Sequence, residues 1–274
     1  MRVRGFLRHV RACGNVTLPG DYVRFRIGAD PVGWLRPHML DELARFPALR
    51  FDPDGVTLTD PPALPAIARA MSDAGYYRWR NEAFDVRAAP DAPALTTIDR
   101  GAIPSFGVMA QGVHVNGLVG EGDDLRIWVG RRAMDKLLDP GKLDHIVAGG
   151  VPAGLTPFET LVKEAQEEAA IPAAIARTAR LVGHVTYAMD RPEGLRRDWL
   201  ACYDLTLPAD FVPAPEDGEV ESFELLPVRQ VMELVHDTDA FKFNVNLVLI
   251  DLFIRVGLIG GEDARILRVE MAGG

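Results

Sequence analysis

Cysteine is almost absent from this chain of 274 residues, which contains only Cys13 and Cys202. Two cysteines cannot build a disulfide scaffold or a zinc site with several cysteine ligands. Scarce cysteine is typical of a reducing compartment, and the arginine-rich N-terminus lacks the apolar core of a secretory signal. The sequence therefore predicts a cytoplasmic location. An amphipathic transit peptide is the alternative, but the apolar spacing from Val3 to Val10 favours a packed helix.

Long apolar runs and an excess of basic charge are also lacking. No window of about 18 apolar residues occurs, which argues against a membrane-spanning helix. Lysine and arginine number 30 against 39 aspartates and glutamates, so the net charge is −9. Because nucleic-acid binding needs a basic surface, we expect no nucleic-acid partner. Because no apolar window is long enough, we expect no membrane partner either. A small phosphorylated molecule in one local basic pocket remains compatible with this charge.

The chain has the composition of a folded protein, with 48% hydrophobic and 25% charged residues. Residues 88–94 are small and proline-bearing, without periodicity, and are interpreted as a linker or a long crossover. We therefore expect an α+β domain over residues 1–95 and a second domain over residues 101–260. The second domain should be a mixed sheet with helices on its faces. Its expected strands cover 112–119, 125–131, 145–148, 181–189, 199–205 and 219–226, and its expected helices cover 158–170, 228–236 and 244–256.

One helix start is unusually well specified. Thr156 is a good N-cap, Pro157 occupies the first helical position, and Glu159 lies three residues after the cap. The helix therefore begins directly after a glycine-containing loop that opens with Gly149 and Gly150.

Three carboxylates follow on this helix. Glu164, Glu167 and Glu168 have the spacing i, i+3 and i+4, so they share one face, beside the apolar stripe. Gathered carboxylates repel one another unless a cation lies between them, and oxygen ligands suit Mg²⁺ or Mn²⁺ rather than zinc. A solvated acidic face is the alternative, but the glycine loop and capping box favour a metal site.

This segment resembles the Nudix box, G-x5-E-x7-R-E-U-x-E-E-x-G-U, in which U is a bulky apolar residue. Gly149 takes the first glycine position, and Glu164, Glu167 and Glu168 take the three metal-binding glutamates. The resemblance implies an α/β/α sandwich and a hydrolase of phosphoric anhydride bonds that uses Mg²⁺ or Mn²⁺. Lys163 stands at the position of the arginine and is expected to join the glutamates in catalysis. The other departures are Leu155, Ala165 and Ala170, and none of them removes a metal carboxylate.

A narrower resemblance covers nearly the whole chain. Residues 6–10, 32–37, 79–82, 142–150 and 217–227 are similar to the Nudix proteins called thiamine pyrophosphokinase-related, which carry a family-specific N-terminal domain before the Nudix domain. It implies a small-molecule diphosphate substrate, thiamine diphosphate or its oxidised analogues, cut to the monophosphate and phosphate. The alternatives are hydrolysis of a nucleoside diphosphate derivative and a Nudix-fold protein that binds a ligand without cleaving it. The three retained glutamates favour hydrolysis.

Further candidate residues lie outside the box. Tyr76, Arg78, Trp79 and Arg80 could stack on a heteroaromatic ring and bind phosphate, with domain-interface packing as the alternative. Glu219 could supply a fourth metal ligand or a general base, and so could Glu221, with a surface strand edge as the alternative. His145 and His184 are interpreted as packing residues, because neither has a partner at metal-ligand spacing.

Overall fold

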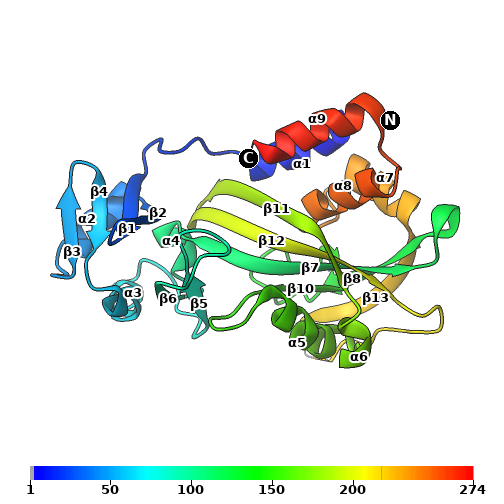
Figure 1. The fold of residues 1–274 in the computed structure, drawn as a ribbon, viewed down its shortest axis with the longest axis horizontal. Coiled ribbons are helices and arrows are strands. Elements are labelled where there is room, and N and C mark those ends of the chain that lie inside the picture. The colour runs from blue at the N-terminus through cyan, green and yellow to red at the C-terminus, as the bar shows by residue number, and fades with distance from the viewer. Residues whose placement is uncertain (1–2, 217, 274) are drawn as a thin grey trace.

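A seven-stranded mixed sheet forms the centre of the computed structural model, which describes residues 3–216 and 218–273 (Figure 1). Where a range expected from the sequence includes residue 1, 2, 217 or 274, that position lies outside the described residues. The strand order is β11-β12-β7-β8-β13, with β10 paired to β7 and β9 paired to β8. The strands are β7 (Met109–Val119), β8 (Arg126–Arg132), β9 (Leu143–His145), β10 (Val147–Gly150), β11 (Arg180–Arg191), β12 (Gly194–Thr206) and β13 (Val220–Pro227).

Helices cover both faces of this sheet, so the predicted α/β/α sandwich is confirmed (Figure 1). One face buries α5 (Pro157–Ala169) and α6 (Ala173–Ala176). The other face buries α1 (Arg4–Cys13), α7 (Val228–Asp237), α8 (Val245–Arg255) and α9 (Gly261–Ala272). Each layer has its own apolar core, because alternate residues of every strand point to opposite faces. The sequence did not predict α9, whose apolar periodicity is weak.

A second body lies at one end of the central sheet (Figure 1). We call residues 23–108 the N-terminal unit. It contains the four-stranded sheet β2-β1-β4-β3, the two-stranded sheet β5-β6 and short helices around a separate core. Its elements are β1 (Val23–Ile27), β2 (Asp30–Leu35), η1 (Pro37–Met39), α2 (Leu40–Leu43), β3 (Leu49–Asp52), β4 (Gly55–Leu58), η2 (Pro61–Ala63), α3 (Leu64–Asp73), β5 (Ala83–Val86), β6 (Thr96–Asp99) and α4 (Ile103–Phe106).

The two ends of this N-terminal region differ from the sequence expectation. Residues 88–94 connect β5 to its antiparallel partner β6, so they join two paired strands. Helix α1 packs on the far side of the molecule, beside α7, α8 and α9 (Figure 1). There Phe6 and Val10 are buried, and Nε2 of His9 lies 2.7 Å from the carbonyl oxygen of Val235. The domain boundary at residues 95–101 stays a prediction.

Candidate active site

The capping box predicted for the carboxylate helix is formed. Thr156 Oγ1 accepts a hydrogen bond from the backbone N–H of Glu159 at 3.2 Å, and Thr156 N–H donates to Glu159 Oε2 at 2.9 Å. Pro157 occupies the first turn, where its missing N–H costs no hydrogen bond. Leu161 and Ala165 are buried against the sheet. The start and the packed face of α5 therefore fix where its glutamates lie.

Glu168 is the most deeply buried of the three box glutamates, with 6% of its surface exposed. Its Oε2 accepts a hydrogen bond from the backbone N–H of Ala148 at 2.9 Å, so α5 is bound directly to β10. Burial raises the pKa of Glu168 well above its ordinary value, and the charge of Glu164 adds to this rise. An unscreened carboxylate at this depth is a strong ligand for a cation.

Glu164 lies against the backbone of Gly149. A Cβ atom placed on Gly149 would be 3.0 Å from both Cγ and Cδ of Glu164, which is closer than ordinary packing allows. Burial raises the pKa of the Glu164 carboxyl, and the charges of Glu167 and Glu219 act in the same direction. The glycine at the first box position therefore leaves room for the close approach of this carboxylate.

Glu167 and Lys163 occupy the outer edge of the same face. Nζ of Lys163 lies 2.5 Å from Oε2 of Glu167 and 3.4 Å from Oε1 of Glu164, and about half of the Lys163 and Glu167 side chains is exposed. The bond to Glu167 raises the pKa of Lys163. The lysine at the arginine position thus places a positive charge between two box carboxylates.

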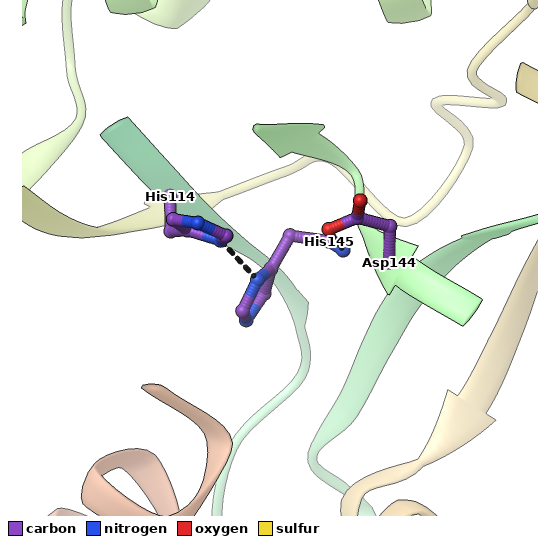
Figure 2. A group of neighbouring side chains, drawn as sticks. All are labelled: His114, Asp144 and His145. Carbon is purple, nitrogen blue, oxygen red and sulfur yellow. Dashed lines mark hydrogen bonds between the residues drawn. The ribbon is translucent and has the colours of Figure 1, made fainter. Parts of the chain in front are cut away.

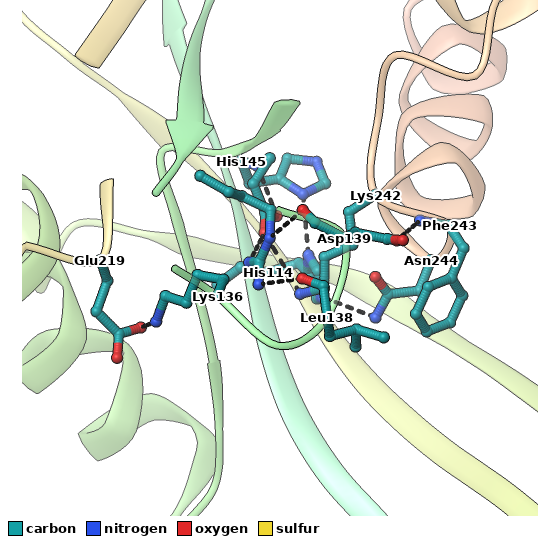
Figure 3. A network of polar contacts seen from close by, with 12 residues as sticks. His114, Lys136, Leu138, Asp139, His145, Glu219, Lys242, Phe243 and Asn244 are labelled. Carbon is teal, nitrogen blue, oxygen red and sulfur yellow. Dashed lines mark hydrogen bonds and ion pairs between the residues drawn. The ribbon is translucent and has the colours of Figure 1, made fainter. Parts of the chain in front are cut away.

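Glu219 joins this acidic group from the start of β13. It forms an ion pair with Lys136, shown in Figure 3, and its charge raises the pKa of both Glu164 and Glu168. Glu168 and Glu219 line one small cavity of about 10 Å³, which has room for a single water or ion. Glu221 is placed differently, because its Oε1 accepts a hydrogen bond from the backbone N–H of Met134 at 3.1 Å.

A buried polar network that the sequence did not predict lies beside this cavity. Nδ1 of His114 is 2.9 Å from Nδ1 of His145, and Asp144 lies next to them (Figure 2). Burial lowers the pKa of His145 to about 4 and keeps its ring neutral near pH 7. His184 lies elsewhere and stacks on Trp199, with ring centroids 5.6 Å apart. The packing interpretation of both predicted histidines agrees with these surroundings.

The ligand atoms of His114, Asp144 and His145 lie within 4.8 Å of one another, which is close enough for one metal ion. Two cations already neutralise the carboxylate, however. Nη1 of Arg132 is 2.7 Å and Nζ of Lys242 is 3.3 Å from Asp144 Oδ2. Burial alone would raise the pKa of Asp144, but these cations outweigh burial and lower that pKa to about 2. We interpret this group as a hydrogen-bonded ion pair of the core.

The four predicted substrate residues lie in the N-terminal unit. Tyr76 stacks on His38 with ring centroids 6.0 Å apart, and Trp79 lies under the guanidinium of Arg69 at 5.1 Å. Arg78 and Arg80, on the same segment, are exposed. These contacts pack the aromatic residues within the N-terminal unit itself and do not place them at a domain interface. A role of Tyr76, Arg78, Trp79 and Arg80 in substrate binding stays a prediction.

Comparison with known proteins decides the family. A model of the NUDIX domain matches residues 111–247. Nudix hydrolase 20, chloroplastic, from Arabidopsis thaliana is 37% identical over 281 residues, which cover 95% of this chain and 75% of that protein. The chain belongs to the Nudix hydrolase family. Nudix hydrolase 24, chloroplastic, from the same plant is 40% identical over 272 residues, covering 94% of this chain and 74% of that protein. The crystal structure of DR0079 from Deinococcus radiodurans covers 68% of this chain and 98% of its own, with 19% identity and a TM-score of 0.46.

This Nudix assignment confirms the enzyme class predicted from the sequence, a pyrophosphohydrolase. Nudix hydrolases act on small-molecule diphosphates and generally use divalent metals. None of the helices within residues 3–216 and 218–273 is long and apolar enough to span a membrane.

The prediction of a cytoplasmic location is wrong, because both plant relatives are named chloroplastic. Scarce cysteine and an N-terminus without an apolar core are the features on which that prediction is based. They do not distinguish the cytoplasm from the interior of an organelle.

Proposed function

We propose that this Nudix hydrolase uses Mg²⁺ or Mn²⁺ to cleave thiamine diphosphate, or an oxidised analogue of it, to the monophosphate and inorganic phosphate. The metal part of this proposal depends on one observation: Glu164 and Glu168 are enclosed carboxylates on one face of α5, and burial raises the pKa of both, with the charge of Glu164 adding to the rise at Glu168. Such a pair is costly to keep charged without a cation.

The residues present fit a divalent cation. Glu164, Glu167 and Glu168 would hold it, with Gly149 close by and Glu219 as a fourth carboxylate. When bound, the cation offsets phosphate charge and lowers the pKa of a water that attacks phosphorus. Two lysines pair with these ligands, Lys163 with Glu167 and Lys136 with Glu219. Once a cation takes over the carboxylates, both ammonium groups are available to bind the diphosphate.

The substrate part of the proposal is supported by sequence similarity along the chain. Residues 6–10, 32–37 and 79–82 resemble the thiamine pyrophosphokinase-related Nudix proteins, and similarity to the two plant relatives extends over about nineteen-twentieths of the chain. Similarity therefore includes the N-terminal unit, where a substrate-selecting surface is expected. A site discriminates strongly between two substrates that differ by one polar group only if it is built to hydrogen-bond that group. If the site of this protein hydrogen-bonds the polar group that oxidation adds, kcat/KM should be higher for the oxidised analogues than for thiamine diphosphate, and this is the ranking we expect.

The test is phosphate release by the full chain from a panel of diphosphates, each with Mg²⁺, with Mn²⁺ and with a chelator. The panel contains thiamine diphosphate, an oxidised analogue, ADP-ribose and a sugar nucleotide. Glu168→Gln should abolish turnover, and Glu233→Gln, on the exposed face of α7, should leave it unchanged. Much faster cleavage of ADP-ribose than of every thiamine derivative would refute the substrate. Turnover in chelator equal to turnover in Mg²⁺ would refute the metal role.

A further inference from the structure

Strand β5 of the N-terminal unit is bound to the loop that leads into the carboxylate helix. The backbone N–H of Ala153 donates to the carbonyl oxygen of Ala83 at 2.8 Å. The next residue, Gly154, donates its N–H to Oδ2 of Asp85 at 3.3 Å. Asp85 is held in turn by Nη2 of Arg87 at 2.7 Å. The path of the chain between β10 and α5 is therefore fixed by a strand that lies outside the Nudix box.

Phe84 lies between these two contacts on β5 and packs on Gly150. A Cβ atom placed on Gly150 would be 2.6 Å from Cζ of Phe84, a distance that real packing does not allow. Phe84 is only 4% exposed and belongs to the core of the N-terminal unit. The ring thus sets how closely the end of β10 can approach that core.

The preceding residue, Gly149, contacts the opposite partner. Its own Cβ position would be 3.0 Å from Cδ of Glu164. Successive residues of a strand point to opposite faces, so the glycine pair separates two side chains. The end of β10 is enclosed between Phe84 on one face and Glu164 on the other. A displacement of β10 toward or away from Phe84 therefore changes the surface of Gly149 against which the Glu164 carboxylate packs.

We propose that Phe84 is a positioning residue for the cation site and that it acts on Glu164 through Gly150 and Gly149. This inference rests on the proposed function, because it takes Glu164 as a cation ligand. Residues that orient metal ligands from behind contribute about 10- to 100-fold in metal affinity or activity. The N-terminal unit then takes part in assembling the catalytic centre as well as in any selection of substrate.

A purely structural role of Phe84 in the core makes a different prediction, and a matched variant separates the two. Phe25 lies in the same core, is completely buried and packs edge-on against Phe106, with ring centroids 5.5 Å apart. Phe25→Leu removes the same atoms as Phe84→Leu at a position on β1. If Phe84 acts only through stability, the two variants should weaken cation binding equally.

The experiment measures Mn²⁺ binding to the full chain by electron paramagnetic resonance, with urea unfolding of each variant as the measure of stability. We expect Phe84→Leu to weaken Mn²⁺ binding about tenfold or more. Phe25→Leu should lower stability and leave the dissociation constant unchanged. An unchanged constant in Phe84→Leu, or equal weakening in both variants, would overturn the inference.

Two further comparisons keep the test independent of one variant's folding. Gly150→Ala introduces a methyl group against Phe84 and should weaken Mn²⁺ binding, whereas the same change in the Phe84→Leu background should cost less, because the ring tip is gone. Asp85→Ala should weaken binding, while Asp85→Asn retains an acceptor for Gly154 and should restore it. The positioning role would be contradicted if Gly150→Ala weakened Mn²⁺ binding equally in the unsubstituted and the Phe84→Leu backgrounds and if Asp85→Asn bound Mn²⁺ no better than Asp85→Ala. An unsubstituted chain that binds no Mn²⁺ would overturn the proposed function itself.

Discussion

Lys163 and Glu167 lie one turn apart on α5, with Nζ 2.5 Å from Oε2, and the same ammonium lies 3.4 Å from Oε1 of Glu164. The positive charge of Lys163 therefore partly neutralises the two carboxylates, as a bound divalent cation would. Because the pair is half exposed, its interaction is worth about 0.2–1 kcal/mol. If Glu164 and Glu167 held a divalent cation, the Lys163 ammonium would compete with it for both carboxylates.

Lys163→Gln should accordingly tighten Mn²⁺ binding, because the competing positive charge is removed. The energy of an exposed pair corresponds to an increase in affinity of at most about fivefold. Electron paramagnetic resonance of free Mn²⁺ measures the constant directly. Lys163→Arg keeps the charge and should leave the affinity near that of the unsubstituted protein. Weaker binding after Lys163→Gln would show that the ammonium supports the ligands and does not compete with the metal.

Metal binding should raise thermal stability. At a Mg²⁺ concentration of 100 times the dissociation constant, the expected gain is about 2.7 kcal/mol, because the ion binds only the folded chain. Glu167→Gln should remove most of this gain, since one ligand oxygen and its charge are lost. Thermal unfolding with and without Mg²⁺ measures the difference, with Glu233→Gln as the exposed control. A full Mg²⁺ effect in Glu167→Gln would remove that residue from the ligand set.

Acid should destabilise the fold through His145. Burial lowers the pKa of this imidazole from 6.5 to about 4. Between these two values the unfolded chain binds a proton that the folded chain does not, so stability falls as pH drops from 6.5 toward 4. Urea unfolding at several pH values across this window measures the slope. Burial also lowers the pKa of His114 and of His9, so His145→Gln should reduce the slope without abolishing it. An unchanged slope would show that His145 does not contribute to the effect.

Ala170 ends α5 in a left-handed conformation, with φ of 53°. The family pattern has glycine here, and alanine in this conformation is strained by about 1 kcal/mol. Ala170→Gly should therefore stabilise the protein by about 1 kcal/mol, measured by urea unfolding. Ala169→Gly, one residue earlier in the helix, serves as the control and should destabilise it. A loss of stability in Ala170→Gly would mean that the methyl group's packing outweighs the backbone strain.

The carboxylate helix could be predicted in detail because its signals are local. Thr156, Pro157 and Glu159 determine the first turn, and helical spacing places the three box glutamates on one face. Spacing gives the angle of each side chain around the helix axis, but it does not tell how deeply that side chain is buried. That Glu168 is buried while Glu167 is half exposed depends on the contact with Ala148 in β10.

Other features depend on contacts between distant segments and leave little trace in the sequence. Strands β5 and β6 have four residues each, too few for a clear alternating pattern, so residues 88–94 resembled a linker. His114 lies within a mostly apolar strand, and its partner His145 is 31 residues away. The register of β10 on β7 and of β9 on β8 brings the two rings together.

The packing of α1 also affects how the protein is made. His9 meets Val235 across 226 residues of chain, and α1 lies beside α9 near the opposite end of the sequence (Figure 1). On the ribosome, the apolar side of α1 lacks most of its partners until α7, α8 and α9 have been synthesised, because of the elements it packs on only β11 is made before them. Helix α1 therefore waits for segments that follow it by more than 200 residues, and chaperones that shield exposed apolar surface have a long opportunity at Phe6, Leu7 and Val10.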